Sequence, residues 1–287
     1  MIFFSIIIPT CNRPDLLKLC LNKLIKSAVN FNLELIEIIV SDDSCDELTR
    51  SMASIQFPHV IWIKGPKKGP AANRNNGAKI AKGEWLIFLD DDIIPDEHII
   101  AGYNKIITKH QNLVAVEGCI EPDDYKLLKK DMAECPVNIT GGCFWSANIA
   151  IKKSSFETIG GFDEQFQIAA NEDQDIYLRL IESYGRAAIV FDKSVKVIHP
   201  VRFATLKKYF SIYSIRVTNY AKFAIKHPEF TKIYKGIAFK AFDLYYSFLK
   251  LILNSIRLRQ FRKFLQHFFD FIFGIPILLY TIKKLNK

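Results

Sequence analysis

The sequence predicts an α/β fold with a mostly parallel central sheet flanked by helices, followed by a basic helical extension. Through residues 1–199, short runs of β-branched residues alternate with segments of helical periodicity, which is typical of repeated strand–helix–strand units. The charge then changes sign, because residues 1–199 hold 22 Lys and Arg against 27 Asp and Glu, whereas residues 200–287 hold 17 against three. We therefore expect one domain at 1–202, with halves at 1–95 and 96–202, and an extension at 203–287.

The expected strands are continuous apolar runs, which suit strands that are covered on both faces. They lie at residues 3–9, 35–40, 60–63, 85–89 and 113–120, with a further strand inside 141–152. Helical periodicity predicts helices at 14–29, 71–82, 95–110 and 172–184. The apolar stripe of the first helix consists of Leu17, Cys20, Leu21, Leu24 and Ala28, and that of the last consists of Ile176, Leu180 and Tyr184. Residues 121–140 are polar and predict a loop with a short helix.

Composition and cysteine spacing exclude several classes of protein. With 49% hydrophobic and 24% charged residues, 13 Gly and 11 Pro, the chain is neither disordered nor collagen-like. The six cysteines form no Cys-x-x-Cys pair, so a reduced, cytoplasmic chain is the simplest interpretation. The apolar start lacks a basic leading segment and a cleavage site, and it therefore predicts a first strand instead of a signal peptide.

Residues 203–287 mix aromatic and aliphatic residues with Lys and Arg at helical spacing. The charge-free run 271–282 has twelve residues, fewer than the roughly 20 that cross a bilayer, and it contains Gly274 and Pro276. Basic helices with aromatic faces favour contact with a membrane surface. The alternative is that they pack on the first domain or on another subunit. The density of Phe, Leu and Ile disfavours a third interpretation, in which the extension binds nucleic acid.

Acidic residues follow two of the predicted strands. Asp42 and Asp43 follow the second strand, and Asp90, Asp91 and Asp92 follow the fourth. Ligands of an open α/β sheet bind outside the carboxyl ends of its strands, so we expect these carboxylates to converge. Three adjacent carboxylates repel one another unless a cation neutralises them, and oxygen ligands suit Mg²⁺ or Mn²⁺. Alternate strand residues share a face, so Asp90 and Asp92 are expected to point together. The alternative is a solvated acidic turn that caps the next helix.

Five segments together resemble family 2 glycosyltransferases in their order and approximate spacing. They read SIIIPTCNRPDLL from residue 5, EIIVSDDS from 37, NRNNGAKIAKGEWLIFLDDD from 73, GGFDEQF from 160 and NEDQDIYLRL from 171. The resemblance covers about residues 3–202 and leaves the extension outside. It implies a GT-A fold, in which a Rossmann-like nucleotide-sugar-binding half is joined to an acceptor-binding half, with a divalent metal at a D-x-D motif.

The resemblance also assigns roles to individual residues. The residues that it implies for nucleotide-sugar binding are Pro9, Thr10, Asn12, Arg13, Asp42, Asp43, Arg74, Asp90, Asp91, His199 and Arg202. The residues that it implies for Mn²⁺ or Mg²⁺ are Asp90, Asp92 and His199, with Asp92 as the direct ligand. Asp173 matches the catalytic base and Glu172 is its neighbour. The residues that match the sugar-binding segment are Gly142, Trp145 and Asn148.

Three of these assignments have a structural alternative. A lone histidine such as His199 is usually structural or exposed. Trp145 is a large aromatic residue that core packing would also explain. Asp173 opens a predicted helix, where an acid also interacts favourably with the helix dipole.

The implied activity is inverting, metal-dependent transfer of a sugar from a nucleoside diphosphate-sugar, with UDP as the default nucleotide, to a hydroxyl of a glycan or lipid-linked acceptor. We expect a cytoplasmic enzyme of surface-polysaccharide or lipopolysaccharide synthesis at the inner face of the cell membrane, touching it through 203–287, with no nucleic-acid partner. The alternatives are a non-catalytic nucleotide-sugar-binding relative and a nucleic-acid-binding protein with a basic tail. A glycosidase is disfavoured, because its two carboxylates need no cluster of three aspartates.

Overall fold

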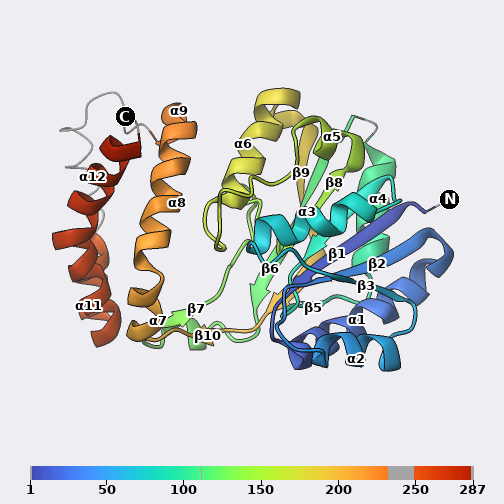
Figure 1. Ribbon diagram of the computed structural model, residues 1–287, viewed down its shortest axis with the longest axis horizontal. Coiled ribbons are helices and arrows are strands. Elements are labelled where there is room, and N and C mark those ends of the chain that lie inside the picture. Colours follow the sequence, from blue (N-terminus) through green and yellow to red (C-terminus); the bar gives the residue numbers. More distant parts are fainter. Residues whose placement is uncertain (1, 111, 232–248, 286–287) are drawn as a thin grey trace. The chain divides into compact units, whose positions relative to one another are not determined.

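The computed structural model describes residues 2–110, 112–231 and 249–285, which fall into two compact units (Figure 1). The first unit comprises Met1–Asp123 and Pro136–Pro200, and the second comprises Asp124–Cys135 and Val201–Lys287. The second unit thus includes residues 124–135, which the sequence analysis assigned to the first domain. Residues 232–248 and 286–287 of the predicted extension lie outside the described residues.

The first unit is built on an eight-stranded sheet in the order β3-β2-β1-β4-β8-β6-β9-β5. Its parallel half consists of β1 (Phe4–Thr10), β2 (Ile36–Asp42), β3 (Val60–Lys64) and β4 (Trp85–Leu89). The other half consists of β8 (Asn148–Lys152), β6 (Ala115–Pro122), β9 (Ile189–His199) and β5 (Ile94–Pro95). Strand β8 is antiparallel to both of its neighbours, whereas β6 and β9 are parallel. The predicted mostly parallel sheet is confirmed.

Helices cover both faces of this sheet, and its central strands β1, β2 and β4 are therefore buried at every residue. The helices on one face are α1 (Pro14–Phe31) and α4 (Ile99–Lys109), and those on the other are α3 (Pro70–Ile80), α5 (Lys153–Thr158) and α6 (Glu172–Tyr184). Successive strand side chains point to opposite faces, so Ile6 packs in the first core and Ile7 in the second. The predicted apolar stripe of α1 is buried. A Cβ at Gly77 would lie 2.6 Å from Ile7, so glycine permits α3 to approach β1 closely.

Some boundaries differ from the sequence prediction. The helix expected at 95–110 begins at Ile99, because the two residues of β5 pair with β9 instead. Tyr184 is exposed rather than buried, because it ends α6 directly before the Gly185 cap. The sequence analysis missed α2 (Leu48–Gln56), whose large apolar residues are partly exposed, and most of β9, whose register with β6 shifts at a bulge.

The second unit is mostly helical. Its helices include α7 (Leu206–Ser211), α8 (Tyr213–Lys226), α9 (Pro228–Thr231), α11 (Phe261–Phe269), the π-helical turn η4 (Asp270–Gly274) and α12 (Ile275–Leu285), and residues 249–257 are also helical. Helices α8 and α12 lie side by side (Figure 1). Ala221 and Ala224 of α8 form an apolar cluster with Leu278 and Ile282 of α12. The Tyr209 hydroxyl donates to Asp270 and so ties α7 to the π-helical turn. A short ladder joins β7 (Ala133–Glu134) to β10 (Arg202–Phe203).

One helix in the described part of the chain, Phe261–Leu285, is long and apolar enough by length and composition to cross a membrane. It has 25 residues, and its most apolar 18-residue window has a mean hydropathy of 1.5 and is only 22% buried. The charge-free run of twelve residues is thus only part of a longer continuous helix. The π-helical turn ends at Gly274, two residues before Pro276, whose missing N–H cannot complete an α-helical hydrogen bond.

Candidate active site

The carboxyl ends of β1, β2 and β4 carry polar side chains to one edge of the sheet. Strand β1 is parallel to both neighbours, so Thr10 lies beside Asp42 and close to the end of β4. The Thr10 hydroxyl donates to Asp91 Oδ2 at 2.6 Å, which joins the first strand to the aspartates that follow the fourth. The structure thus brings the two acidic segments to the same edge, as the strand pattern predicts.

Arg13 bridges two of the three consecutive aspartates. Its Nη2 lies 2.8 Å from Asp91 Oδ1, and its Nη1 lies 2.9 Å from Asp92 Oδ2. Asp91 is fully buried, and this burial raises its pKa to about 7 against the opposing effects of Arg13 and Thr10. The guanidinium predicted to bind the nucleotide is therefore engaged by carboxylates in this structure.

Asp90, Asp92 and His199 form a set of three ligand groups, whose candidate ligand atoms all lie within 4.8 Å of one another. His199 reaches this set from the end of β9, and its Nε2 lies 3.3 Å from Asp92 Oδ1. Its Nδ1 lies 3.1 Å from the Pro200 carbonyl oxygen. If Nδ1 carries the proton and donates it to that carbonyl, the Nε2 lone pair faces a carboxylate oxygen. Two such lone pairs need a cation or a proton between them.

Arg74 is the buried cation of the site. From α3 its Nη2 lies 2.9 Å from Asp90 Oδ1 and its Nη1 lies 3.4 Å from Glu172 Oε1, while its guanidinium lies 5.5 Å from the centre of the Phe162 ring. Burial alone would lower the pKa of Arg74, but the carboxylates of Asp90, Asp173 and Glu172 outweigh burial and raise it. Its charge is therefore permanent and fixed in place.

Glu172 and Asp173 begin α6, directly after Asn171, whose φ of 72° lies in the left-handed region. Burial raises the pKa of Glu172, as does the neighbouring Asp173 carboxylate, while Arg74 opposes the rise. Burial also raises the pKa of Asp173, against the effects of Arg74 and Ser146. Asp173 Oδ1 is buried and has no hydrogen-bond partner among the described residues. This oxygen is therefore left without a hydrogen-bond donor from the described part of the protein.

Charge and donor chemistry at this edge fit a divalent cation. The carboxylates gathered here are those of Asp90, Asp91, Asp92, Glu172 and Asp173. Only two guanidinium groups, those of Arg13 and Arg74, pair with them in the described part of the chain, so acidic groups outnumber the guanidinium groups that pair with them. Carboxylate oxygens with one imidazole suit Mn²⁺ or Mg²⁺ bound together with substrate phosphates.

Asp42 and Asp43 lie at the end of β2, away from the cation ligands. Asp42 is buried and accepts hydrogen bonds from the Ser44 backbone N–H at 2.9 Å and from Trp62 Nε1 at 3.0 Å. Asp43 accepts from the Lys67 backbone N–H at 2.7 Å, and burial raises its pKa. The sequence analysis missed Trp62, which lies on β3 beside Val40 of β2 and holds the Asp42 carboxylate.

The segment that follows β1 is held by hydrogen bonds to the loop that follows β2. The buried Pro9 lies within β1. Asn12 has a φ of 54°, its backbone N–H donates to Ser44 Oγ at 2.7 Å, and its Oδ1 accepts from the Cys45 backbone N–H at 3.1 Å. The exposed Asn12 side chain thus connects the loops that follow β1 and β2.

Glu117 on β6 organises the predicted sugar-binding segment, and the sequence analysis missed it. Its carboxylate accepts hydrogen bonds from the backbone N–H groups of Gly142, at 2.8 Å, and Phe144, and from Asn138 Nδ2 at 2.8 Å. A lone acid inside an apolar strand was the available signal, because a buried carboxylate needs partners. Trp145 is partly buried and packs against the first core, which agrees with the structural alternative for this residue.

Asn148 does not belong to the site. Its side chain is fully buried, its Oδ1 accepts from the Tyr103 hydroxyl at 2.8 Å, and its Nδ2 donates to the carbonyls of Cys119, at 2.9 Å, and Val195, at 3.1 Å. Both amide hydrogens are thus used in hydrogen bonds inside the sheet, which corrects the predicted sugar contact.

Arg202 is exposed on β10 and belongs to the second unit, whereas the other predicted site residues belong to the first.

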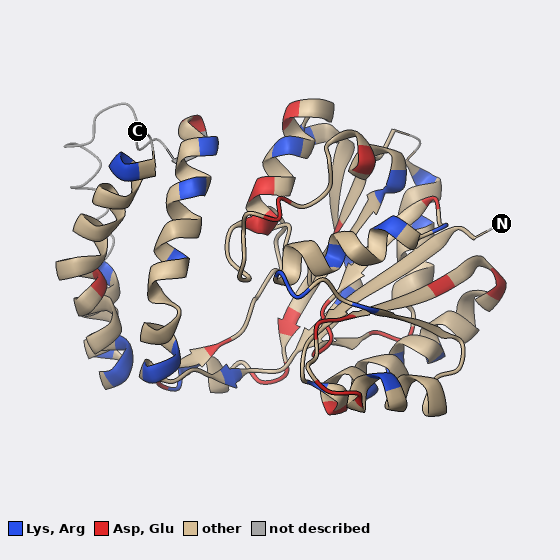
Figure 2. Ribbon diagram, viewed as in Figure 1, with Lys and Arg blue, Asp and Glu red and all other residues tan. Residues whose placement is uncertain are grey.

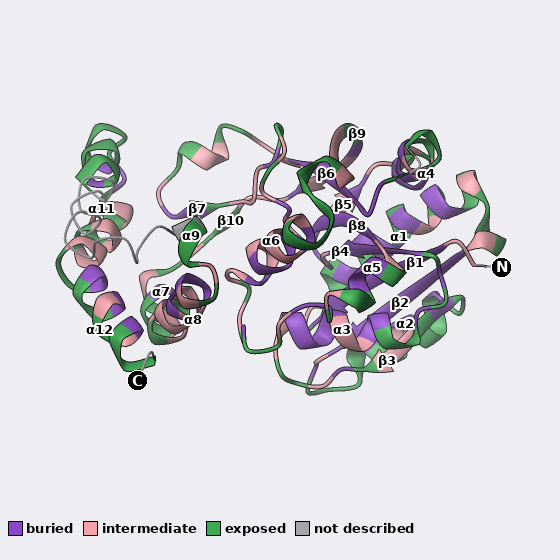
Figure 3. Cartoon of the chain, turned by 90° about the horizontal axis from the view of Figure 1, so that it is seen from above, coloured by how far each residue is buried: buried purple, intermediate pink, exposed green. Residues whose placement is uncertain are grey.

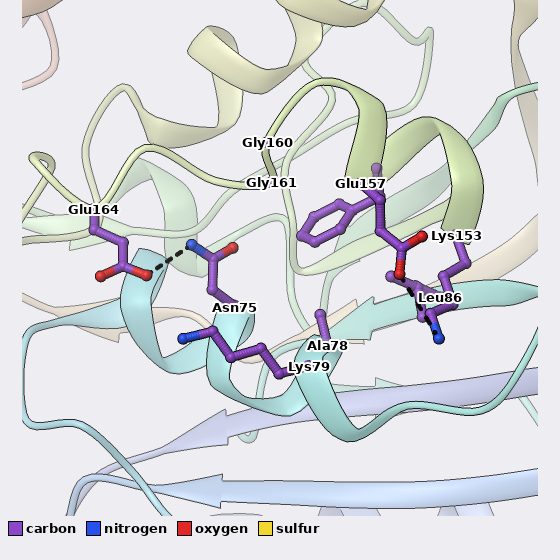
Figure 4. A pocket seen from close by; sticks show the side chains of 10 residues that line it. Asn75, Ala78, Lys79, Leu86, Lys153, Glu157, Gly160, Gly161 and Glu164 are labelled. Carbon is purple, nitrogen blue, oxygen red and sulfur yellow. Dashed lines mark hydrogen bonds and ion pairs between the residues drawn. The ribbon is translucent and has the colours of Figure 1, made fainter.

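A separate cavity of about 310 Å³ lies among α3, β4 and α5 (Figure 4). The residues that line it are Asn75, Ala78, Lys79, Leu86, Lys153, Phe156, Glu157, Gly160, Gly161 and Glu164. Two polar contacts join residues that line this cavity. Asn75 Nδ2 donates to Glu164 Oε1 at 3.0 Å, and Lys153 Nζ lies 3.8 Å from Glu157 Oε1. None of the predicted site residues lines it.

Comparison with known protein families decides the identity of the chain. Residues 5–159 match the model of the family described as Glycosyl transferase family 2. The chain belongs to glycosyltransferase family 2. Residues 124–233 also match the description Glycosyltransferase like family 2. The predicted family and enzyme class are confirmed, since relatives of this family 2 chain are named glycosyltransferases.

Two curated relatives show the extent of the likeness. An uncharacterized glycosyltransferase of Haemophilus influenzae is 30% identical over 195 residues, which is 62% of this chain and 62% of that protein. The GalNAc(5)-diNAcBac-PP-undecaprenol beta-1,3-glucosyltransferase of Campylobacter jejuni is 42% identical over 110 residues, 37% of this chain and 33% of that protein. The family 2 chain therefore spans less than two thirds of the length of these relatives.

Two solved structures resemble the fold. S. aureus TarS 1–349 in complex with UDP has a TM-score of 0.56 at 16% identity, covering 95% of this chain and 92% of that one. The mannosyltransferase PcManGT of Pyrobaculum calidifontis, in complex with GDP-Man and Mn²⁺, has a TM-score of 0.56 at 16% identity, covering 98% and 73%. These likenesses confirm the predicted GT-A fold.

Proposed function

We propose that this family 2 glycosyltransferase transfers a sugar, with inversion, from a nucleoside diphosphate-sugar to a hydroxyl group in a metal-dependent reaction. The observation that carries the proposal is the convergence, at one edge of the sheet, of a three-ligand cation site, a buried arginine and a pair of buried carboxylates. Phosphate binding, charge stabilisation and proton removal are the tasks that sugar transfer from a diphosphate requires.

Asp173 acts as the general base in this proposal. Its carboxylate accepts the proton of the acceptor hydroxyl while that oxygen attacks the anomeric carbon and the diphosphate leaves from the opposite face. One direct displacement inverts the anomeric centre. Arg74 presents a fixed positive charge toward the departing phosphates. Held by Asp90, Asp92 and His199, Mn²⁺ or Mg²⁺ would supply further stabilisation of the negative charge that grows on the diphosphate.

The donor that we propose is a UDP-sugar, with Asp42 and Asp43 on the side of the base and Pro9 and Thr10 lining the pocket. Each Asp42 oxygen accepts one hydrogen bond within the protein and keeps a lone pair that a base N–H can use. The solved neighbours support a nucleotide donor, because TarS is described with UDP and with UDP-GlcNAc, and PcManGT with GDP-Man.

The acceptor that we propose is a glycan or lipid-linked glycan, in the synthesis of surface polysaccharide or lipopolysaccharide at the cytoplasmic face of the membrane. The Campylobacter relative is named for a diphospho-undecaprenol acceptor. A poly(ribitol-phosphate) beta-glucosyltransferase of Bacillus spizizenii is 34% identical over 104 residues, 35% of this chain and 16% of that protein. Gly142, held by Glu117, and Trp145 are the residues that we propose on the acceptor side.

Thermal unfolding tests this function directly. We expect UDP or a UDP-sugar to raise the unfolding temperature only when Mn²⁺ or Mg²⁺ is present, because a ligand that binds only the folded state stabilises it. At about 100 times its Kd, one ligand adds about 2.7 kcal/mol, which corresponds to several degrees. The panel includes GDP and dTDP, so that it also reports the nucleotide preference.

Three outcomes would contradict the proposal. A nucleotide-dependent shift that chelation of metal leaves unchanged would remove the metal from the mechanism. A clear shift with the preferred nucleotide-sugar, but no transfer to water or to any glycan or lipid-linked acceptor, would favour a non-catalytic relative. Salt-sensitive binding of RNA or DNA without any nucleotide-sugar shift would favour the nucleic-acid alternative.

We also propose that the second unit contacts an anionic membrane surface. The helix Phe261–Leu285 is mostly unburied, and its exposed apolar residues include Phe261, Phe273 and Tyr280. Helices α7, α8, α11 and α12 also carry many Lys and Arg residues and few acidic ones, as the blue and red segments of Figure 2 show. Figure 3 shows α11 and α12 mainly in the colours of exposed and intermediate residues. Each basic residue near an anionic surface contributes about 1 kcal/mol.

Vesicle binding checks this proposal. We expect the full chain to sediment with phosphatidylglycerol-containing vesicles, and the Phe261→Glu and Phe273→Glu double variant to bind them at least tenfold more weakly, because each substitution puts a carboxylate against lipid. Ile55→Glu is the matched control, since Ile55 is 78% exposed on α2 of the first unit. Equal binding by the double variant and the control would show that this helix makes no lipid contact. Extraction by alkaline carbonate distinguishes surface contact from a spanning helix.

A further inference from the structure

Asp91 lies between the two aspartates of the cation site but points elsewhere, and its contacts suggest why it is there. Its Oδ2 accepts from Thr10 Oγ1 at 2.6 Å, and its Oδ1 lies 2.8 Å from Arg13 Nη2. One oxygen thus accepts a hydrogen bond, the other forms an ion pair with Arg13, and the side chain is fully buried. Asp91 is therefore fixed between β1 and Arg13 rather than free to bind a cation.

The Arg13 guanidinium that contacts Asp91 also contacts Asp92. The fork of its guanidinium places Nη1 2.9 Å from Asp92 Oδ2, while Asp92 Oδ1 lies 3.3 Å from His199 Nε2. The two oxygens of Asp92 therefore have different surroundings, because one faces Arg13 and the other faces the remaining cation ligands. A carboxylate held by one oxygen presents the other in a fixed direction.

The backbone that carries Arg13 is itself fixed. Asn12 adopts a φ of 54°, and both its backbone N–H and its side-chain Oδ1 are hydrogen-bonded to the loop after β2. Pro14 then begins α1 directly after Arg13. The position of the guanidinium is thus set by its neighbours in the chain as well as by the two aspartates.

We propose that Asp91 and Arg13 are a positioning pair that aims Asp92 Oδ1 at the divalent cation. This inference rests on the proposed metal dependence and gives the middle aspartate a task that is not ligation. Arg13 stays on Asp92 Oδ2 when the cation binds, because the cation needs only the other oxygen. The opposite possibility is that Arg13 is a substitute cation, which the metal must displace.

Direct titration of Mn²⁺ into the full chain, without nucleotide, separates these two possibilities. We expect Arg13→Gln to weaken Mn²⁺ binding by about 10- to 100-fold, which is the usual effect of losing a partner that orients a metal ligand. Asp91→Asn weakens binding in the same direction, and the double variant binds no more weakly than Arg13→Gln, because Asp91 acts through Arg13. Arg13→Lys stays weaker than the wild type, since one ammonium group cannot bridge both aspartates.

The controls keep the test decisive. Lys18→Gln removes one positive charge from an exposed position on α1 and leaves Mn²⁺ binding unchanged. The unfolding temperature without metal identifies any variant that has only lost stability, and Arg13→Lys serves if Arg13→Gln does not fold. Unchanged or tighter Mn²⁺ binding by folded Arg13 variants would overturn the inference. If the wild type itself bound no Mn²⁺, the proposed metal dependence would fail instead.

Discussion

Replacing Asp173 with asparagine is expected to lower kcat by about 10²- to 10⁴-fold, the usual contribution of a positioned general base. The amide is nearly the same size as the carboxylate but cannot accept the proton of the acceptor hydroxyl. Donor binding should stay nearly intact, because the cation ligands Asp90, Asp92 and His199 and the Arg74 guanidinium remain in place. A fall in kcat without a matching rise in the Kd for the donor would assign Asp173 to the chemical step.

The pH dependence of the same reaction gives an independent check. Burial raises the pKa of Asp173, and a general base works only when it is deprotonated. Activity should therefore fall as the pH drops through this raised pKa, at a higher pH than for an exposed aspartate. Glu182→Gln is the matched control, because Glu182 is exposed on the same helix. Full kcat in Asp173→Asn would move the base to another group, and Glu172→Gln would then be the variant to measure.

The strand pattern was enough to predict where the aspartates meet, because parallel strands end on the same edge of a sheet. It could not predict that Arg74 lies between Asp90 and Glu172, since the two carboxylates are far apart in the sequence and meet only through the packing of α6 on the sheet. The resemblance to a family implied that Arg74 takes part in nucleotide-sugar binding, but it did not assign these two ion pairs.

Buried polar residues are where the sequence interpretation failed. Asn148 was expected to contact the sugar because its segment resembles the sugar-binding segment of the family, yet its amide joins β8 to the carbonyls of two other strands. Glu117 looked like an ordinary strand residue, yet it holds the backbone of the Gly142 segment. A polar residue in an apolar run must find partners, but the sequence does not say whether these are the protein's own groups or a ligand.

Replacing Asp92 with alanine is expected to abolish the metal-dependent part of nucleotide-sugar binding. Asp92 faces His199 with one oxygen and Arg13 with the other, so its loss removes the proposed direct ligand and the partner of Arg13 together. In calorimetric titrations with Mn²⁺, the Kd of the variant for UDP should rise to the value that the wild type shows after chelation of metal. Asp15→Ala, which removes an exposed carboxylate from the first turn of α1, should bind like the wild type.

A second substitution at the same position separates ligation from charge. Asp92→Asn keeps only one oxygen, which can face the cation or Arg13 but not both, and it loses the negative charge. A Kd between those of the wild type and Asp92→Ala would show that one neutral oxygen retains part of the binding. If Asp92→Ala kept metal-dependent binding, Asp90 and His199 would have to hold the cation without it, and the proposed direct ligand would be wrong. Because Asp173 lies outside the ligand set, its asparagine variant should still show the Mn²⁺-dependent shift that Asp92→Ala loses. The two substitutions therefore divide the site into a part that binds the donor and a part that removes the proton.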